Sequence, residues 1–449
     1  MKLRVVFVVA MAALCHSTLI QAQSKGQEHW VATWGTAELL VRTPPPPVAN
    51  GIQPPPRSGT TPGPQSGGEA AARPTPQQIN ARGFNNQTVR MIVRTSLGGR
   101  RLRVGISNAF GSAPVELGAA HIALRTKDSE IDPKSDHALT FSGKPGCRLG
   151  PGVVLLSDPV ELTVPPVTDL AVSLFFPGTT GPPTSHATAL HTTYISNEGD
   201  ATAQASMPDA ITTQSYYYLA TVDVMAQADA ALIVTYGDSI TDGARSNNET
   251  NHSWPALLAA RLAAKKETAH IGVSNMGIGG NRVLRDGSGA SALARLDRDV
   301  FSQAGVKWLM LLEGINDIGR EVATPAEATT ADELIAAYKQ IIERAHTHGI
   351  VVIGCTLTPY GGAGYQRDTG EAVREGVNQW IRTSGAFDAV VDFEAATRDP
   401  DNPKRFRADF DPGDHLHPND AGYQSMADAI DLSIFAGKHA AAVGSGSKR

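Results

Sequence analysis

A serine in a short polar run could act as a nucleophile. Ser239 lies in the run Gly237–Thr241 (G-D-S-I-T), directly after an apolar segment that ends at Tyr236. A serine hydroxyl is a weak nucleophile unless a base within hydrogen-bonding distance accepts its proton. Taken alone, a G-D-S run after a strand is typical of a turn. Ser239 therefore needs partners from elsewhere in the chain.

The candidate base lies far downstream, in the run 411–419 (D-P-G-D-H-L-H-P-N). Asp414 precedes His417 by three residues, so its carboxylate could accept from one ring nitrogen and leave the other free for the serine proton. Two other interpretations stay open: a polar loop that caps the next helix through Asn419, and a metal site. No H-x-x-x-H or C-x-x-C pair completes a ligand set, so we expect no metal and no cofactor.

Two further runs could stabilise an oxyanion. The glycines of 275–281 (N-M-G-I-G-G-N) would let a backbone N–H approach a substrate oxygen closely. Asn316, in the run 313–317 (E-G-I-N-D), could present a side-chain amide donor. Each run is also a common turn composition, so neither is diagnostic alone.

The elements that must position these residues begin at about residue 229, where apolar runs alternate with helical patterns. The predicted strands are 231–236, 271–275, 306–312, 351–356 and 389–391. The predicted helices cover about 255–265 and 331–348, the second opening with a capping box at Thr330 and Glu333. This alternation predicts a parallel sheet covered on both faces, with the site at the carboxyl ends of its strands.

Together and in this order, the four runs resemble the conserved blocks of the SGNH (GDSL-type) hydrolase family. The resemblance covers roughly residues 229–435, about half of the chain. It implies a flavodoxin-like three-layer α/β/α domain and ester hydrolysis through an acyl-enzyme. Ile240 stands where the family name has leucine, which conserves an apolar side chain.

The resemblance also implies a role for each matching residue. By motif, these are Ser239 as nucleophile and first oxyanion donor, Gly280 and Asn316 as the other oxyanion donors, His417 as general base and Asp414 as its orienting carboxylate. Gly277 and Gly279 stay open as alternatives to Gly280.

The front half of the chain has a β-rich pattern. Runs of β-forming residues at 89–94, 102–106 and 170–176 predict a β-sandwich-like accessory domain over 23–228. Within it, residues 43–76 hold eleven prolines and five glycines, which predicts an extended loop. The run 29–34 and a strand pair near 89–110 resemble, more weakly, the N-terminal region of larger secreted bacterial members. The hydrolase domain is expected over 229–437 and a flexible tail over 438–449.

The N-terminus and the overall charge indicate where the protein works. Lys2 and Arg4 precede an apolar run at 5–14, which is the layout of a secretory signal peptide over 1–22 and predicts a secreted or periplasmic protein. The run is too short to span a bilayer, so no stable membrane insertion is expected after cleavage. The 449-residue chain has a net charge of −5 and no basic run, so no nucleic-acid partner is expected.

Substrate class follows from the resemblance only. An exported esterase with an accessory β-rich domain is expected to cleave short acyl esters of carbohydrates, such as an acylated polysaccharide. Lipase, lysophospholipase and thioesterase activities stay open. The alternatives from other classes are a metallohydrolase and a non-catalytic glycan-binding protein on a hydrolase scaffold. The intact set of Ser239, Asn316, Asp414 and His417 argues against the glycan-binding protein.

Overall fold

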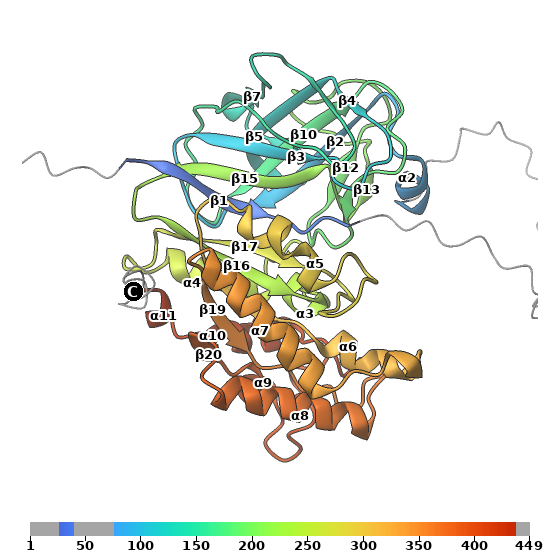
Figure 1. Cartoon of the computed structure of the whole chain (residues 1–449). Helices are drawn as coiled ribbons and strands as arrows, with labels where there is room; N and C mark the ends of the chain where they lie inside the picture. Colours follow the sequence, from blue (N-terminus) through green and yellow to red (C-terminus); the bar gives the residue numbers. More distant parts are fainter. Residues whose placement is uncertain (1–26, 40–75, 437–449) are drawn as a thin grey trace, which may run out of the picture.

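The computed structural model describes residues 27–39 and 76–436. The expected signal peptide at 1–22, the proline-rich loop up to residue 75 and the tail at 438–449 lie outside the described residues. Figure 1 shows an upper region of antiparallel strands and a lower region in which strands alternate with helices. The change falls between strand β15 (Leu219–Ala226) and strand β16 (Ala231–Gly237).

In the described part of the front half, two antiparallel sheets carry most of the strands. The first has the order β1 (His29–Gly35), β15, β3 (Leu102–Ser107), β9 (Val154–Leu156). The second has the order β13 (Ile211–Thr213), β12 (Thr193–Ile195), β2 (Gln87–Arg94), β10 (Asp169–Phe176), β5 (Ala119–Lys127), β6 (Glu130–Ile131), with β7 (His137–Ala138) also paired to β5. Two short ladders join β4 (Val115–Leu117) to β8 (Cys147–Leu149) and β11 (Ser185–His186) to β14 (Tyr216–Tyr217). Helix α2 (Pro76–Arg82) precedes the second sheet.

The predicted strand pair near 89–110 is wrong as a pair, although both strands exist. β2 bonds to β10 and β12, whereas β3 bonds to β15 and β9 in the other sheet. Alternate residues of both strands, such as Met91 and Val104, lie in one buried core. Residues on the other face of β2, such as Ile92, lie in a second, smaller core. Two strands that share a core can belong to facing sheets or to one sheet, and their alternation is the same in both cases.

In the described residues from 231 onward, five parallel strands form one sheet in the order β17 (Ile271–Gly277), β16, β18 (Val306–Leu312), β19 (Val351–Cys355), β20 (Ala389–Val391). Their bounds agree with the predicted strands to within two residues. All seven residues of β16 are buried, as expected for a strand covered on both faces. The register places Gly237 beside both Gly277 and Leu312, so the runs that follow these three strands start at the same edge of the sheet.

Helices cover the sheet in two groups. Helix α4 (Trp254–Ala263) packs on β17 and on α10 (Asp420–Asp428), whereas α7 (Ala331–Thr347) packs on β19 and on α8 (Asp368–Thr383). The flavodoxin-like three-layer α/β/α fold is therefore confirmed. The capping box of α7 is also confirmed, because the Thr330 hydroxyl accepts from the Glu333 amide and the Glu333 carboxylate accepts from the Thr330 amide.

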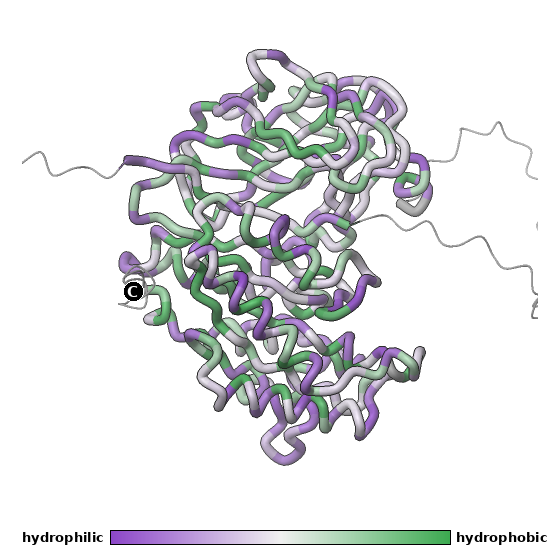
Figure 2. The backbone as a smooth tube through the Cα atoms, viewed as in Figure 1, coloured by the Kyte–Doolittle hydropathy of each residue, from purple (hydrophilic) through white to green (hydrophobic). Residues whose placement is uncertain are grey.

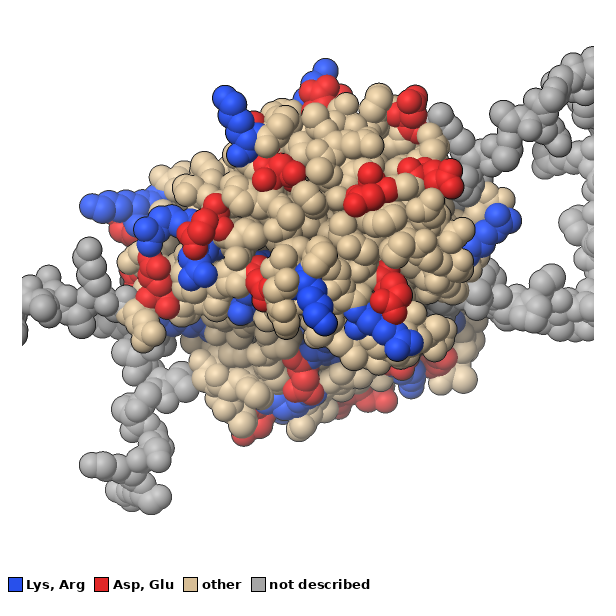
Figure 3. Space-filling view, turned by 90° about the horizontal axis from the view of Figure 1, so that it is seen from above, with Lys and Arg blue, Asp and Glu red and all other residues tan. Residues whose placement is uncertain are grey.

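The two regions share one apolar core. Strand β1 packs on β17, and Thr36 bridges to Asn275. Figure 2 shows apolar segments concentrated in the strands of both regions. On the face seen in Figure 3, acidic and basic side chains are interspersed among uncharged residues. Among residues 27–39 and 76–436, no helix has the length and apolar content needed to cross a bilayer.

Candidate active site

The sharp turn after β16 positions Ser239. Ser239 is the first residue of α3 (Ser239–Asp242), and Asp238 caps this turn by accepting from the Ile240 amide at 2.9 Å. A Cβ on Gly237 would lie 2.1 Å from the Leu312 carbonyl oxygen, so only glycine fits between these two strand ends. The amide of a residue at a helix start has no partner within the helix and can face a ligand.

The three predicted triad residues meet at the edge of the parallel sheet. The Oγ of Ser239 lies 2.8 Å from His417 Nε2, and His417 Nδ1 lies 3.0 Å from Asp414 Oδ2. The other carboxylate oxygen, Oδ1, accepts from the amides of Leu416 at 3.1 Å and His417 at 3.0 Å. This arrangement can move a proton from the serine hydroxyl to an imidazole whose tautomer the carboxylate fixes.

Asp414 is held as a carboxylate. Partial burial alone would raise its pKa, but hydrogen bonds from the amide and ring of His417 and from the Leu416 amide lower it well below its ordinary value. Arg245 adds a further bond, from Nε to Asp414 Oδ2 at 2.9 Å. An ionised carboxylate stabilises the imidazolium that forms when His417 takes a proton. Sequence reasoning missed Arg245, which lies in no conserved run.

The residues predicted to bind an oxyanion lie on the runs that follow β17 and β18, at the same edge of the sheet as Ser239. Gly280 has a φ of +75°, which favours glycine. The amide of Gly277 donates to Asn275 Oδ1 at 2.9 Å, which leaves Gly279 and Gly280 as the available glycines. In helix α6 (Ile315–Gly319), Asn316 donates one side-chain N–H to the Asn281 carbonyl at 2.9 Å.

Gly280 and Asn316 open onto a hollow of about 640 Å³ whose walls carry several charged side chains. Its lining comprises Gly280, Arg282, Asp286, Gly287, Ser288, Asn316, Gly319, Arg320, Val322, Ala323, Glu327 and Tyr365. Arg282 pairs with Glu327 at 2.8 Å, and Arg320 pairs with the same carboxylate at 3.4 Å. In the part of the chain that the structure describes, the hydroxyl of Tyr365 has no hydrogen-bond partner.

A buried arginine ties the strand ends together beneath the site. Arg295, in helix α5 (Ala292–Leu296), is fully buried. Its guanidinium donates to the Gly237 carbonyl at 2.9 Å, to the Met276 carbonyl at 2.8 Å and to Asn281 Oδ1 at 2.9 Å. Arg295 therefore joins the run 237–241, at the end of β16, to the run 275–281, at the end of β17. Sequence reasoning missed Arg295, because no local pattern marks a buried arginine as a partner of distant carbonyls.

Buried carboxylates complete this support. Arg295 also pairs with Asp299 at 3.1 Å and with Glu313 at 3.5 Å, and burial raises the pKa of Glu313. Burial raises the pKa of Asp238 to about 7 and that of Asp317 to about 6. Asp317 accepts from the amides of Val283 and Leu284 at 2.7 and 3.0 Å, so it holds the segment that follows the glycine run.

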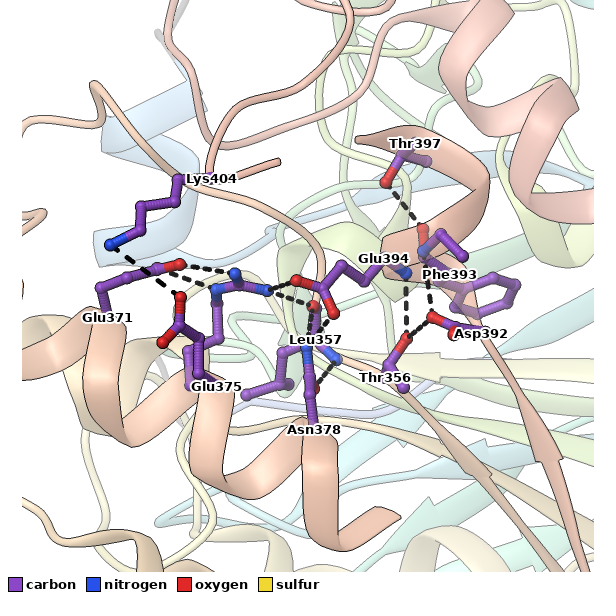
Figure 4. A network of polar contacts seen from close by, with 12 residues as sticks. Thr356, Leu357, Glu371, Glu375, Asn378, Asp392, Phe393, Glu394, Thr397 and Lys404 are labelled. Atoms are coloured by element: carbon purple, nitrogen blue, oxygen red, sulfur yellow. Dashed lines mark hydrogen bonds and ion pairs between the residues drawn. The ribbon is translucent and has the colours of Figure 1, made fainter. Parts of the chain in front are cut away.

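A second polar network joins helix α8 to the segments that follow β19 and β20 (Figure 4). Arg374, on the buried face of α8, pairs with Glu371 and with Glu394 and donates to the Leu357 carbonyl at 3.1 Å. Leu357 belongs to the segment after β19 that leads to Tyr365. The ring of Tyr365 packs on Gly319, where a Cβ would lie 2.5 Å from a ring carbon.

The run 411–419 also performs the structural role that its sequence allowed. Asn419 caps α10 by accepting from the Gly422 amide at 3.1 Å. His415 pairs with Asp411 and not with the residues of the relay, so the two histidines of the run have separate partners. Within 27–39 and 76–436, no group of three His, Cys, Asp or Glu side chains could hold a metal ion.

Comparisons with known proteins give one family and several solved structures. The model of the GDSL-like lipase/acylhydrolase family matches residues 235–425. A putative lipolytic protein of the G-D-S-L family from Desulfitobacterium hafniense is 22% identical, over 44% of this chain and 97% of that one, with a TM-score of 0.34. A single-residue variant of an acetyl xylan esterase from Geobacillus stearothermophilus is 25% identical, over 44% of this chain and 93% of that one, with a TM-score of 0.35. A comparison with curated proteins finds no match.

Proposed function

We propose that Ser239, His417 and Asp414 carry the reaction of a carboxylic ester hydrolase in this chain, whose residues 235–425 match the model of the GDSL-like lipase/acylhydrolase family. One observation carries this proposal: the unbroken relay from Ser239 Oγ to His417 Nε2 at 2.8 Å and from His417 Nδ1 to Asp414 Oδ2 at 3.0 Å. A serine with such a base is the activated nucleophile of acyl transfer.

The reaction follows from these positions. Ser239 Oγ attacks the ester carbonyl carbon while His417 Nε2 takes its proton, which gives a tetrahedral oxyanion and an imidazolium facing Asp414. The amides of Ser239 and Gly280 and the remaining side-chain N–H of Asn316 stabilise that oxyanion. The alcohol then leaves with the proton from His417. Water, activated by the same imidazole, hydrolyses the acyl-enzyme and frees Ser239.

The substrate class in this proposal is a short acyl ester of a hydroxyl-rich compound such as an acylated carbohydrate. Its support is the wall of the hollow beside the oxyanion residues, where Arg282, Arg320 and Glu327 form ion pairs. A long alkyl chain laid along these charges would cover polar groups without giving them partners, which is unfavourable. Sugar hydroxyls could donate and accept there.

The division of the chain and its destination belong to the same proposal. An accessory β-rich domain would end near residue 228, between the last antiparallel strand, which ends at Ala226, and the first parallel strand, which begins at Ala231. The composition of residues 1–22 supports export of the protein to the periplasm or the medium.

The test is hydrolysis of p-nitrophenyl esters from acetyl to palmitoyl by the wild type and by Ser239→Ala. We expect the highest rate on acetate, release of acetate from acetylated xylo-oligosaccharides, and loss of nearly all turnover in Ser239→Ala with an unchanged unfolding temperature. Ser253→Ala is the matched control, because Ser253 is buried near the site without capping its helix through its side chain. A maximum on palmitate would move the substrate to lipids. Equal rates in wild type and Ser239→Ala would refute the assignment of the nucleophile.

A further inference from the structure

The β-rich region directly contacts the helical turn that carries Ser239. His186, in β11, places Nε2 at 3.0 Å from Asp242 Oδ1 and Nδ1 at 2.7 Å from the Ala37 carbonyl oxygen. Asp242 is the last residue of α3, three residues after Ser239. Both side chains are almost fully buried, with 3% of His186 and 5% of Asp242 exposed. The contact therefore joins two parts of the chain without solvent between them.

The partners of the His186 ring determine which of its nitrogens carries a hydrogen. The Ala37 carbonyl can only accept, so Nδ1 must carry a hydrogen. Asp242 faces the other nitrogen at 3.0 Å, so a proton there would place an imidazolium directly against a carboxylate. Burial alone would lower the pKa of His186, but the charge of Asp242 and the bonds to Asp242 and Ala37 raise it above its ordinary value. A buried charge whose partner is removed is strongly destabilising, so each side chain depends on the other.

Helix α3 needs such an anchor because it is a single turn of four residues. One turn gains little from its own hydrogen bonds and is held by tertiary contacts. The Asn275 side chain donates to the Thr241 carbonyl at 2.9 Å from one side, and His186 holds Asp242 from the other. A Cβ on Gly279 would lie 3.8 Å from Asp242 Oδ2, so this carboxylate also borders the glycine run that leads to Gly280.

The segment that follows α3 is also bonded to the β-rich region. Glu249 accepts from the Thr192 amide at 2.5 Å and from Arg125 at 2.9 Å, both in the β-rich region. Four residues earlier in the same segment, Arg245 donates to Asp414 Oδ2 at 2.9 Å. Contacts from the β-rich region thus hold both α3 and the segment after it, which carries Arg245.

We propose that His186 is a positioning residue for the ester hydrolysis: through Asp242 it fixes the orientation of α3 and hence of the Oγ and amide of Ser239. This inference rests on the proposed function of Ser239. It makes the β-rich region part of the catalytic unit, in addition to any role that it has in binding polysaccharide. Catalytic groups must be held within a fraction of an ångström, and a displacement of about 1 Å can lower the rate by about 100-fold.

The experiment compares His186→Ala with His121→Ala. His121 pairs with Asp136 at 2.9 Å within the β-rich region and is 17% exposed, so it supplies a histidine–aspartate pair that does not touch α3. We expect His186→Ala to lower kcat on p-nitrophenyl acetate by about 10- to 100-fold with KM within about twofold of the wild type. The rate at which a p-nitrophenyl phosphonate modifies Ser239 should fall by the same factor. His121→Ala should keep kcat, whatever its effect on the unfolding temperature.

Conservative variants keep the test decisive if His186→Ala does not fold. His186→Gln retains one neutral donor toward Asp242 and should recover part of kcat, and Asp242→Asn keeps the shape of the side chain but loses its charge. A wild type that hydrolyses no ester would refute the proposed function itself. An active wild type, together with wild-type kcat in both His186→Gln and Asp242→Asn, would refute the positioning role alone.

Discussion

The side-chain amide of asparagine has two N–H groups, and Asn316 uses one of them for the Asn281 carbonyl at 2.9 Å. That bond orients the amide, and the other N–H is left for the oxyanion. We expect Asn316→Ala to lower kcat by roughly 100- to 1,000-fold, because loss of one oxyanion donor costs about that much, with little change in KM. Steady-state kinetics on p-nitrophenyl acetate measures this, and thermal unfolding separates any loss of structure. A decrease smaller than tenfold would show that Asn316 is not a donor.

The catalytic residues could be predicted where a short run of sequence contains them. Ser239, Asp414 and His417 were all identified from local sequence, and the structure brings them within hydrogen-bonding distance of one another. Arg245 and Arg295 were not, because their partners lie far away in the chain and no spacing reveals them. Likewise, only the structure shows which glycine amides of the run 275–281 are already bonded.

At the scale of elements, Arg295 connects helix α5 to the ends of β16 and β17 and pairs with Glu313 after β18. Replacing it with methionine would keep much of its apolar stem but leave Glu313 buried without its cation, whereas Asp299 would keep its pair with Arg298 at 2.7 Å. We expect Arg295→Met to lower the free energy of unfolding by about 3–5 kcal/mol in urea titrations.

The matched control is Arg344→Met, whose pair with Asp297 at 2.8 Å is partly exposed. Exposed ion pairs contribute little, so this change should cost less than about 1 kcal/mol. Equal losses in the two variants would mean that Arg295 is not a support of the strand ends.

The elements themselves were predictable in proportion to how apolar their buried faces are. The five parallel strands are nearly continuous apolar runs, and α7 has both an apolar stripe and a capping box. Helix α8 was missed because its buried face includes Glu371, Arg374 and Asn378. Such a helix is held by the ion pairs of Figure 4, which hydrophobic spacing does not detect.

At the scale of the whole molecule, a buried carboxyl between the two regions makes stability depend on pH. Burial raises the pKa of Glu38 to about 7, although the Ser107 hydroxyl donates to it at 2.5 Å. The unfolded chain releases this proton near its ordinary pKa of about 4.3, so Glu38 lowers the stability of the fold progressively as pH rises from about 4.3 to about 7.

Glu38→Gln lacks this titration. We therefore expect the unfolding temperature of the variant, relative to that of the wild type, to be several degrees higher at pH 8 than at pH 5. Differential scanning calorimetry of both proteins at the two pH values measures the difference. A difference between the proteins that stays constant with pH would show that Glu38 does not titrate in this range.

The general architecture was also predictable, but not the way in which its parts meet. The change from antiparallel to parallel strands follows from the change in sequence pattern near residue 229. The shared core, the bridge from Thr36 to Asn275 and the pair of His186 with Asp242 join segments that have no pattern in common. Contacts of this kind depend on the final packing, which a single sequence read locally does not contain.

The length of chain between the two ends of the relay has a kinetic consequence. His417 lies 178 residues beyond Ser239. Closing a chain segment of that length costs about 5 kcal/mol of configurational entropy, which the contacts in between must first offset. Contacts between distant residues also slow folding. During refolding from denaturant, secondary structure should therefore return before esterase activity, and the recovery of activity would report the last step of assembly.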